Sequence, residues 1–421
     1  MLARLVKVER FEVPALAWSF AYFFCLLSAY YILRPVRDEM GIQGGVQNLP
    51  WLFTATFFTM LAAVPLFGWI TARYPRRVVL PAVYGFFIAN LALFFFAFQV
   101  DELRPYVARV FFVWVSVFNL FVVSVFWSFM VDLFSDEQGK RLFGFIAAGG
   151  TSGAIAGPAL TTGLATTLGP VNLLWVSAAL LALAVLCIHR LTAWSHGRGA
   201  APSPHARGAA EEGSLGGSVW GGIVHLVRSP YLLGICFYLF CYTALSTLLY
   251  VEMARLVSVE FASPRERTQL FATLDLVVNV ITLALQVAAT GRMLSRIGVT
   301  ATLALLPAFA ALGFIVLGAA PTLTVLAGFG VLRRAGEFAL SKPAREVLFT
   351  VVAREAKYKA KNVIDTVVYR GGDVLASWLV ALLRGLGLGL SALSFAAVPL
   401  ALAWLGAAVW LGRRYEAARR A

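Results

Sequence analysis

Ionisable side chains gather in an apolar part of the sequence, where residues 333–347 read RRAGEFALSKPAREV. The stretch follows TLTVLAGFGVL without a turn signal, so it is expected to continue a hydrophobic helix. A charge at bilayer depth is unfavourable by about 2.5–3.5 kcal/mol on insertion scales and usually faces a cavity or another charge. Cations outnumber anions here by four to two, and such a surplus suits an anionic ligand.

The helical spacing of this stretch places four polar residues on roughly one face: Arg334, Glu337, Ser341 and Arg345. Lys342 and Glu346 lie four residues apart, so they are expected to form an ion pair on the same helix. The alternative to an anion site is that the charges only neutralise one another in structural pairs.

A second group of charges ends the first apolar run, in YYILRPVRDEMG at residues 30–41. Arg34 and Arg37 are three residues apart and therefore share a face, and Pro35 is expected to break or kink the helix between them. The competing interpretation is an interfacial cluster whose long side chains reach the membrane surface.

Two further polar patterns follow a helical repeat. The first is the stripe Asp275, Asn279, Thr282 and Gln286, which faces either a water-filled path or another helix; we favour the path, where Asp275 could also bind a coupling proton. The second repeats every four residues beside Arg370 and consists of Asp365, Tyr369 and Asp373. Ion pairing with the neighbouring helix is the alternative for this second pattern.

The composition identifies the class of protein. The 421 residues are 60% hydrophobic and 13% charged, with a mean hydropathy of +0.81, which is typical of a polytopic membrane protein. The net charge of +14 therefore indicates basic cytoplasmic loops, and nucleic acid is not an expected partner. The four cysteines lie in apolar runs without metal-ligand spacing, so neither a disulfide nor a metal site is expected.

Apolar windows of about 20 residues predict the membrane-spanning helices. They lie at 15–35, 51–72, 79–99, 107–132, 142–166, 170–190, 228–252, 268–291, 299–318, 321–350, 363–388 and 392–412. The fold class predicted is therefore an all-α membrane protein of twelve transmembrane helices in two six-helix bundles, 1–193 and 221–421. Residues 194–220, rich in Gly, Ser, Pro and Ala, are expected to be a flexible linker. The excess of Lys and Arg in alternate loops places this linker and both termini in the cytoplasm of a bacterial inner membrane.

An internal repeat supports two parallel halves. GWITARYPRR at 68–77 and GRMLSRIG at 291–298 both follow the second span of a half, and each has Gly, four residues and Arg. These residues, Gly68 and Arg73 with Gly291 and Arg296, resemble the cytoplasmic loop motif of the major facilitator superfamily. Close helix approach at the glycines is expected. A separate ridge for close helix packing is expected at Gly149, Gly153 and Gly157.

Three stretches resemble the ATP/ADP translocases of plastids and obligate intracellular bacteria: LRPVRDEMG, FWSFMVDLFSDEQGKRLFG at 126–144, and residues 337–373. That resemblance implies nucleotide exchange on a major-facilitator-like fold, with Arg37 on a substrate-linked basic position of the family. The sequence departs from the family at Val115, where a carboxylate is missing, and at Asp373, where the family has Lys. These departures favour a polyanion-handling apparatus retuned for another substrate.

The predicted function is that of a secondary transporter working by alternating access on an anionic or nucleotide-like solute. The expected substrate-binding residues are Arg34, Arg37, Arg334, Lys342, Arg345 and Arg370. The expected coupling or gating residues are Asp275, Asn279, Glu337, Asp365 and Asp373. Two alternatives remain, a proton-coupled carrier of an unrelated metabolite and a membrane scaffold or sensor that transports nothing. No enzymatic activity and no cofactor are expected, and the protein is expected to be a monomer in the bilayer.

Overall fold

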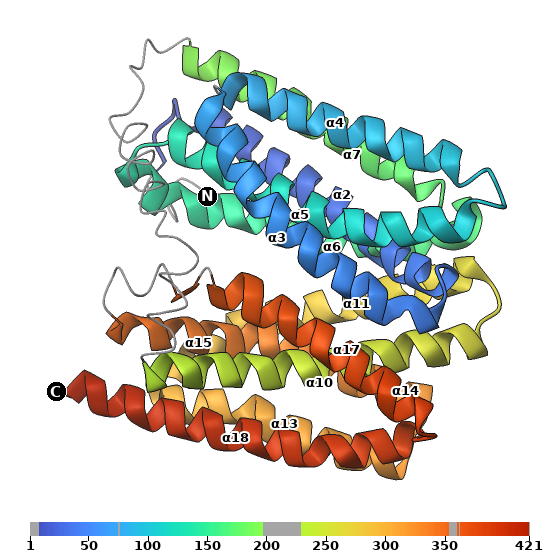
Figure 1. Cartoon of the computed structure of the whole chain (residues 1–421). Coiled ribbons are helices and arrows are strands. Elements are labelled where there is room, and N and C mark those ends of the chain that lie inside the picture. The colour runs from blue at the N-terminus through green and yellow to red at the C-terminus, as the bar shows by residue number, and fades with distance from the viewer. Residues whose placement is uncertain (1–7, 75, 197–228, 353–359, 362, 421) are drawn as a thin grey trace. The chain divides into compact units, whose positions relative to one another are not determined.

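The computed structural model describes residues 8–74, 76–196, 229–352, 360–361 and 363–420, and it is helical almost throughout these ranges (Figure 1). Ten of the described helices are long and apolar enough to cross a membrane. They are built on α2 (Val13–Gln43), α3 (Leu49–Arg73), α4 (Arg76–Ala97), α5 (Arg104–Leu133), α6 (Asp136–Leu168), α7 (Leu173–His196), α10 (Pro230–Glu260), α11 (Pro264–Leu285), α13 (Gly298–Ala319) and α18 (Leu390–Arg420).

The two remaining predicted windows overlap helices that are interrupted by π-helical turns. The first comprises α14 (Leu323–Gly336), the π turn η3 (Glu337–Ser341) and α15 (Lys342–Leu348). The second comprises the π turn η5 (Ile364–Val368) and α17 (Tyr369–Gly385). A third π turn, η2 (Gln286–Thr290), joins α11 to α12 (Gly291–Arg296). The predicted all-α membrane fold is confirmed, and π turns in such helices often mark functional sites.

The contacts divide the chain into two compact units. Unit 1 consists of Met1–Gly44, Ala62–Gly216 and Phe261–Leu276, and unit 2 consists of Gly45–Leu61, Gly217–Glu260 and Val277–Ala421. Helices α3 and α11 are therefore each divided between the units. Residues 194–196 of the predicted linker are the last residues of α7. Residues 197–220 of the linker lie outside the described residues.

In unit 1, α6 packs directly against the backbone of α2, and the predicted glycine ridge makes this possible. A Cβ on Gly149 would lie 2.5 Å from the Phe20 carbonyl oxygen, and one on Gly153 would lie 2.5 Å from that of Phe24. A Cβ on Gly157 would lie 2.7 Å from a carbonyl oxygen one turn further along α2. The predicted close packing at all three glycines is confirmed, since backbone atoms cannot rotate away as side chains can.

In unit 2, α13 and α18 lie side by side along their lengths (Figure 1), and α10 packs against α17. Gly372 allows the second contact, because a Cβ at this position would overlap the hydroxyl of Thr243 on α10. These close helix pairs hold the polar residues of α10 and α17 in fixed positions.

One local prediction is corrected and another stays open to test. Pro35 does not break α2, which continues to Gln43; its neighbours Leu33 and Val36 are fully buried, and packing of this kind lets membrane helices tolerate proline. A Cβ on Gly68 or on Gly291 would meet no described atom within 4 Å, and close helix approach at these glycines stays a prediction.

Both arginines of the repeat, Arg73 and Arg296, lie in the last turn of their helices and are exposed. The Arg73 guanidinium lies 5.9 Å from the centre of the Trp69 ring, which is one turn earlier on the same helix. This contact fixes the side chain over its own helix end.

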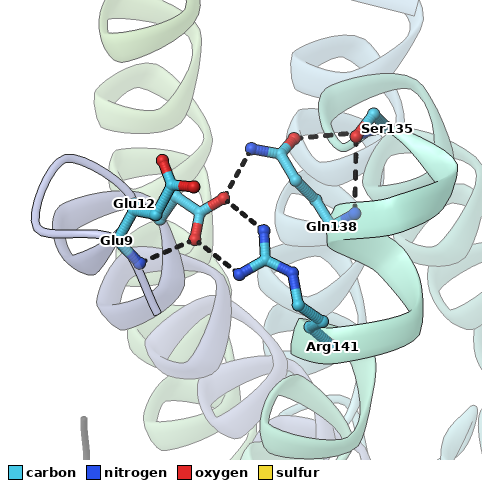
Figure 2. A network of polar contacts seen from close by, with 5 residues as sticks. All are labelled: Glu9, Glu12, Ser135, Gln138 and Arg141. Carbon is cyan, nitrogen blue, oxygen red and sulfur yellow. Dashed lines mark hydrogen bonds and ion pairs between the residues drawn. The ribbon is translucent and has the colours of Figure 1, made fainter. Parts of the chain in front are cut away.

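A buried carboxylate ties the start of α2 to the start of α6 (Figure 2). Glu12 is 1% exposed and accepts hydrogen bonds from the Glu9 backbone N–H (3.0 Å), Gln138 Nε2 (2.8 Å) and Arg141 Nη2 (3.0 Å). Gln138 also completes a capping box with Ser135. The side chain that donates to Glu12 is therefore held in place by the N-terminal cap of α6. Burial alone would raise the pKa of the Glu12 carboxyl, but these hydrogen bonds together lower the pKa below its ordinary value.

Replacing Glu12 with Gln is expected to lower the free energy of unfolding by about 1–3 kcal/mol, because Arg141 loses its anionic acceptor. The wild-type contribution should be complete above the unfolded carboxyl pKa of about 4.3 and should be lost as pH falls through the lower folded pKa. Thermal unfolding of both proteins between pH 3 and 7 measures this difference. A stability difference that does not change over this range would contradict the assignment to the Glu12 carboxylate.

Candidate functional site

The polar cluster of unit 2 is assembled from α10, α17 and the helix that α14, η3 and α15 form together. Arg345 Nη1 lies 3.4 Å from Glu337 Oε1, and both side chains are less than 10% exposed. Arg370 Nη1 lies 3.6 Å from Asp373 Oδ2, while Thr247 donates a 2.8 Å hydrogen bond to the other oxygen of that carboxylate. Two of the predicted basic residues are therefore matched with two of the predicted acidic ones.

Arg333 differs from these paired arginines. Its residue is 4% exposed, its Nη1 donates a 2.7 Å hydrogen bond to Ser246, and its guanidinium lies 5.4 Å from the centre of the Tyr242 ring. Within the described part of the chain no carboxylate lies within ion-pair distance of Arg333, and its Nε has no hydrogen-bond partner. A buried guanidinium in this state favours an incoming anion strongly, because water no longer solvates its charge.

The structure corrects the predicted common face of this helix. Arg333, not Arg334, is buried with Glu337, Ser341 and Arg345, and Arg334 is half-buried. The π turn η3 takes one extra residue into the helix, which rotates the faces on its two sides by about 100° relative to each other. A regular helical repeat therefore selects the wrong arginine of the pair.

Aromatic rings pack against one another next to this cluster. The Tyr242 ring lies 6.3 Å from Tyr369 and 6.0 Å from Trp404, and Tyr238 lies 5.4 Å from Trp404. The Tyr238 hydroxyl is 2.8 Å from Ser341 Oγ, so the aromatic face of α10 is attached to the π turn. Sequence reasoning missed Trp404, since nothing distinguishes it from a packing tryptophan on α18.

One acceptor and one donor beside these rings have no partner. Glu337 Oε2 and Trp404 Nε1 are buried and make no hydrogen bond to any described residue. Glu337 Oε2 can therefore accept a further hydrogen bond, and Trp404 Nε1 can donate one.

Two predicted site residues of this region are not among the described side chains of the cluster. Lys342 is exposed, and Glu346 pairs with Lys361 Nζ at 2.6 Å, so the predicted Lys342–Glu346 pair is wrong. The reason is that the fold places Lys361, which precedes η5, beside the Glu346 carboxylate. Asp365 lies in η5, but its side chain is outside the described residues.

The π turns of two helices are joined by side-chain hydrogen bonds to backbone carbonyls. Gln286 Nε2 donates to the Phe338 carbonyl (3.3 Å), and the Thr290 hydroxyl donates to the Ala339 carbonyl (2.7 Å). Because a π turn disturbs the regular helical ladder, these donors from η2 stabilise η3. Of the predicted stripe, Asn279 is half-buried, Thr282 is buried and Gln286 is exposed.

The predicted arginines of α2 are paired within unit 1. Arg34 Nε lies 3.5 Å from Asp275 Oδ2, and Arg37 Nη2 lies 2.8 Å from Asp38 Oδ1. The Arg37 guanidinium also covers the Phe112 ring at 4.9 Å. Asp275 therefore forms an ion pair with another helix. The sequence had favoured a water-filled path, with this pairing as the alternative.

Two buried carboxylates were missed. Glu39 is fully buried and its Oε2 lies 2.9 Å from Arg267 Nε. Glu252 is also fully buried and is contacted by both Arg255 and Arg384 in unit 2. Each lies near the end of a long apolar helix. A single acidic residue in that position could have indicated a buried ion pair. In the described ranges no group of three His, Cys, Asp or Glu could hold a metal ion.

Comparison with known proteins shows that the chain is similar in sequence to ADP,ATP carrier proteins. The chain is 23% identical to ADP,ATP carrier protein 1 of Chlamydia trachomatis serovar D, over 99% of this chain and 92% of the carrier. It is also 23% identical to ADP,ATP carrier protein 2 of Chlamydia pneumoniae, over 92% and 86% of the two chains. The resemblance of the sequence to nucleotide translocases is thereby confirmed.

Solved transporters share the fold. A bacterial homologue of the iron transporter ferroportin, in an inward-facing state, superposes with a TM-score of 0.66 at 14% identity, covering 96% of this chain and 98% of its own. A nucleoside transporter superposes with a TM-score of 0.63 at 14% identity, covering 97% and 100%. The model of the Major Facilitator Superfamily matches residues 15–341. The chain is therefore an integral membrane protein that belongs to the Major Facilitator Superfamily.

Proposed function

We propose that the protein is a secondary transporter that moves a nucleotide-like anion across the membrane by alternating access. The observation that carries the proposal is Arg333, a buried guanidinium with the Tyr242 ring beside it and no described carboxylate within ion-pair distance. The ADP,ATP carrier relatives and the superfamily membership support the same class of solute.

In this proposal Arg333 receives the anionic group of the solute, and the paired arginines respond to it. Guanidinium groups bind phosphate oxygens through two parallel hydrogen bonds. Arg345 and Arg370 would be released in part from Glu337 and Asp373 as the anion arrives, which couples binding to rearrangement of these ion pairs. Further contacts are proposed for the other basic residues: Arg34, Arg37, Arg334 and Lys342. Gating roles are proposed for Asp275, Asn279 and Asp365.

We propose the cellular arrangement on the basis of the loop charges. The two halves are residues 1–193 and 221–421, joined by a linker at 194–220. Both termini and this linker lie on the cytoplasmic side of a bacterial inner membrane, where basic loops are retained. The protein acts as a monomer and carries out no chemical conversion of its solute.

Counterflow in proteoliposomes tests the proposed function. Vesicles containing the purified protein and a high internal concentration of unlabelled nucleotides should accumulate external labelled nucleotide transiently, whereas protein-free vesicles should not. The nucleoside mono-, di- and triphosphates are each supplied as the label. Absence of accumulation for all of them, together with no thermal shift by any of them, would refute a nucleotide-like solute.

Arg345→Ala is expected to reduce uptake by at least about tenfold and to destabilise the protein, because Glu337 then remains buried without its partner. The double variant R345A/E337A should recover the lost stability but not the uptake. R345K should keep part of the uptake, because the charge remains although the planar fork does not. Uptake assays and thermal unfolding of the three variants separate the two effects.

The matched control is Arg104→Ala, which removes an exposed arginine paired with Asp101. R104A should leave the uptake rate and the unfolding temperature close to those of the wild type, because exposed ion pairs contribute little to stability. Recovery of uptake along with stability in R345A/E337A would show that Arg345 has a structural role alone.

A further inference from the structure

The charges of the unit 2 cluster limit the charge of the solute that it can bind. Three arginines and two carboxylates form the cluster: Arg333, Arg345 and Arg370 with Glu337 and Asp373. Two of the arginines are each matched by one carboxylate. Arg333 therefore supplies the single positive charge that no described carboxylate balances.

Three arginines of unit 1 are likewise matched by carboxylates of that unit. Arg34, Arg37 and Arg267 each lie beside one carboxylate, respectively Asp275, Asp38 and Glu39. An added phosphate beyond the first would have to draw an arginine away from its carboxylate. That exchange would leave a carboxylate buried and unpaired, which is strongly unfavourable.

The cluster also offers a hydrogen-bond acceptor beside its cation. Glu337 Oε2 is buried and has no described partner, so it can accept a hydrogen bond from an N–H or O–H group. The Tyr242 ring lies 5.4 Å from the Arg333 guanidinium and 6.3 Å from the Tyr369 ring, so flat apolar surfaces lie beside the cation. One cation, one acceptor and flat apolar surfaces fit a molecule with one anionic group, one polar donor and an aromatic ring.

We propose that the solute is a nucleoside monophosphate: Arg333 binds its single phosphate, Glu337 Oε2 accepts a hydrogen bond from its base or ribose, and the unit 2 rings contact the base. This inference rests on the proposed function and narrows it. A monophosphate carries a charge of about −1.5 to −2 at neutral pH, close to what Arg333 and a partly released Arg345 can balance. Each further phosphate adds negative charge, and the five described residues of the cluster offer no second arginine without a carboxylate partner.

Binding of the four common nucleosides and of their mono-, di- and triphosphates to the purified protein tests this inference. The measurement is equilibrium titration in metal-free buffer, so that each nucleotide carries its full charge. For the preferred base, the monophosphate should bind at least tenfold more tightly than the di- and triphosphates and than the uncharged nucleoside. A di- or triphosphate that binds as tightly as the monophosphate would overturn the inference and leave the proposed function standing. No binding by any member of the series would overturn both.

Glu337→Gln provides the sharper test, because it removes the negative charge that balances Arg345 and keeps the size of the side chain. The ratio of diphosphate to monophosphate affinity should rise at least tenfold in E337Q. Asp373→Asn, which releases Arg370, should shift the ratio in the same direction and serves if E337Q does not fold. The matched control Asp101→Asn removes an exposed carboxylate and should leave the ratio unchanged. An unchanged ratio in both E337Q and D373N would show that charge balance in this cluster does not set selectivity.

Discussion

Arg333→Gln is expected to reduce transport strongly without lowering the stability of the protein. The buried guanidinium has no described carboxylate to lose, so its removal takes away an unfavourable buried charge together with one cation–π contact and one hydrogen bond. Burial of an unpaired charge is unfavourable by several kcal/mol, which offsets the loss of about 0.5–2 kcal/mol from the cation–π contact. Loss of a charged hydrogen-bond donor to phosphate should lower uptake by about 30-fold or more, which corresponds to about 2 kcal/mol.

Arg345→Gln provides the matched comparison. This arginine is paired with Glu337, so R345Q should be less stable than wild type by about 3–5 kcal/mol. Thermal unfolding and uptake are measured for both variants and for R333K, which should keep part of the uptake. If R333Q proved as unstable as R345Q, Arg333 would be a structural residue, and the anion site would have to lie elsewhere.

Gly153→Leu is expected to prevent correct folding. A Cβ at this position would lie 2.5 Å from the Phe24 carbonyl oxygen and 3.0 Å from the Ser28 nitrogen, so α2 and α6 would have to separate. Overpacking usually lowers stability by about 1–3 kcal/mol, and a contact with backbone atoms should exceed that range. The separation would also displace Arg34 and Arg37, which lie further along α2.

The control for this variant lies on the same helix. A Cβ on Gly163 would meet no described atom within 4 Å, so Gly163→Leu should fold normally and gain up to about 1 kcal/mol of helix propensity. The yield of monodisperse protein and its unfolding temperature distinguish the two variants. Equal behaviour of G153L and G163L would contradict the close packing of α2 on α6.

The helices and the glycine ridge could be predicted from the sequence because both depend on local patterns. Each span is an apolar run of the right length, and Gly149, Gly153 and Gly157 recur at a helical interval. The π turns could not be predicted, because the position of the one-residue shift in the helical repeat is not marked by any residue type. That is why the helical repeat selected Arg334 and the structure buries Arg333.

The charged residues of the site could be found from the sequence, but their partners could not. An ionisable residue in an apolar run stands out by itself, as Arg345 and Asp373 did. Pairing depends on helices that are distant in sequence, such as α2 with α11 for Arg34 and Asp275. Sequence spacing favoured a Lys342–Glu346 pair, whereas the folded chain brings Lys361 to Glu346.

Equilibrium binding of nucleotides to the wild-type protein and to R333Q tests the central claim most directly. Both proteins are titrated in lipid nanodiscs with the nucleotide that binds the wild type most tightly. Wild-type binding should weaken with added salt, since it depends on charge, and R333Q should bind at least 30-fold more weakly while unfolding at the same temperature or above. Equal affinity of the two proteins for that nucleotide would contradict the assignment of Arg333 as the anion-binding residue.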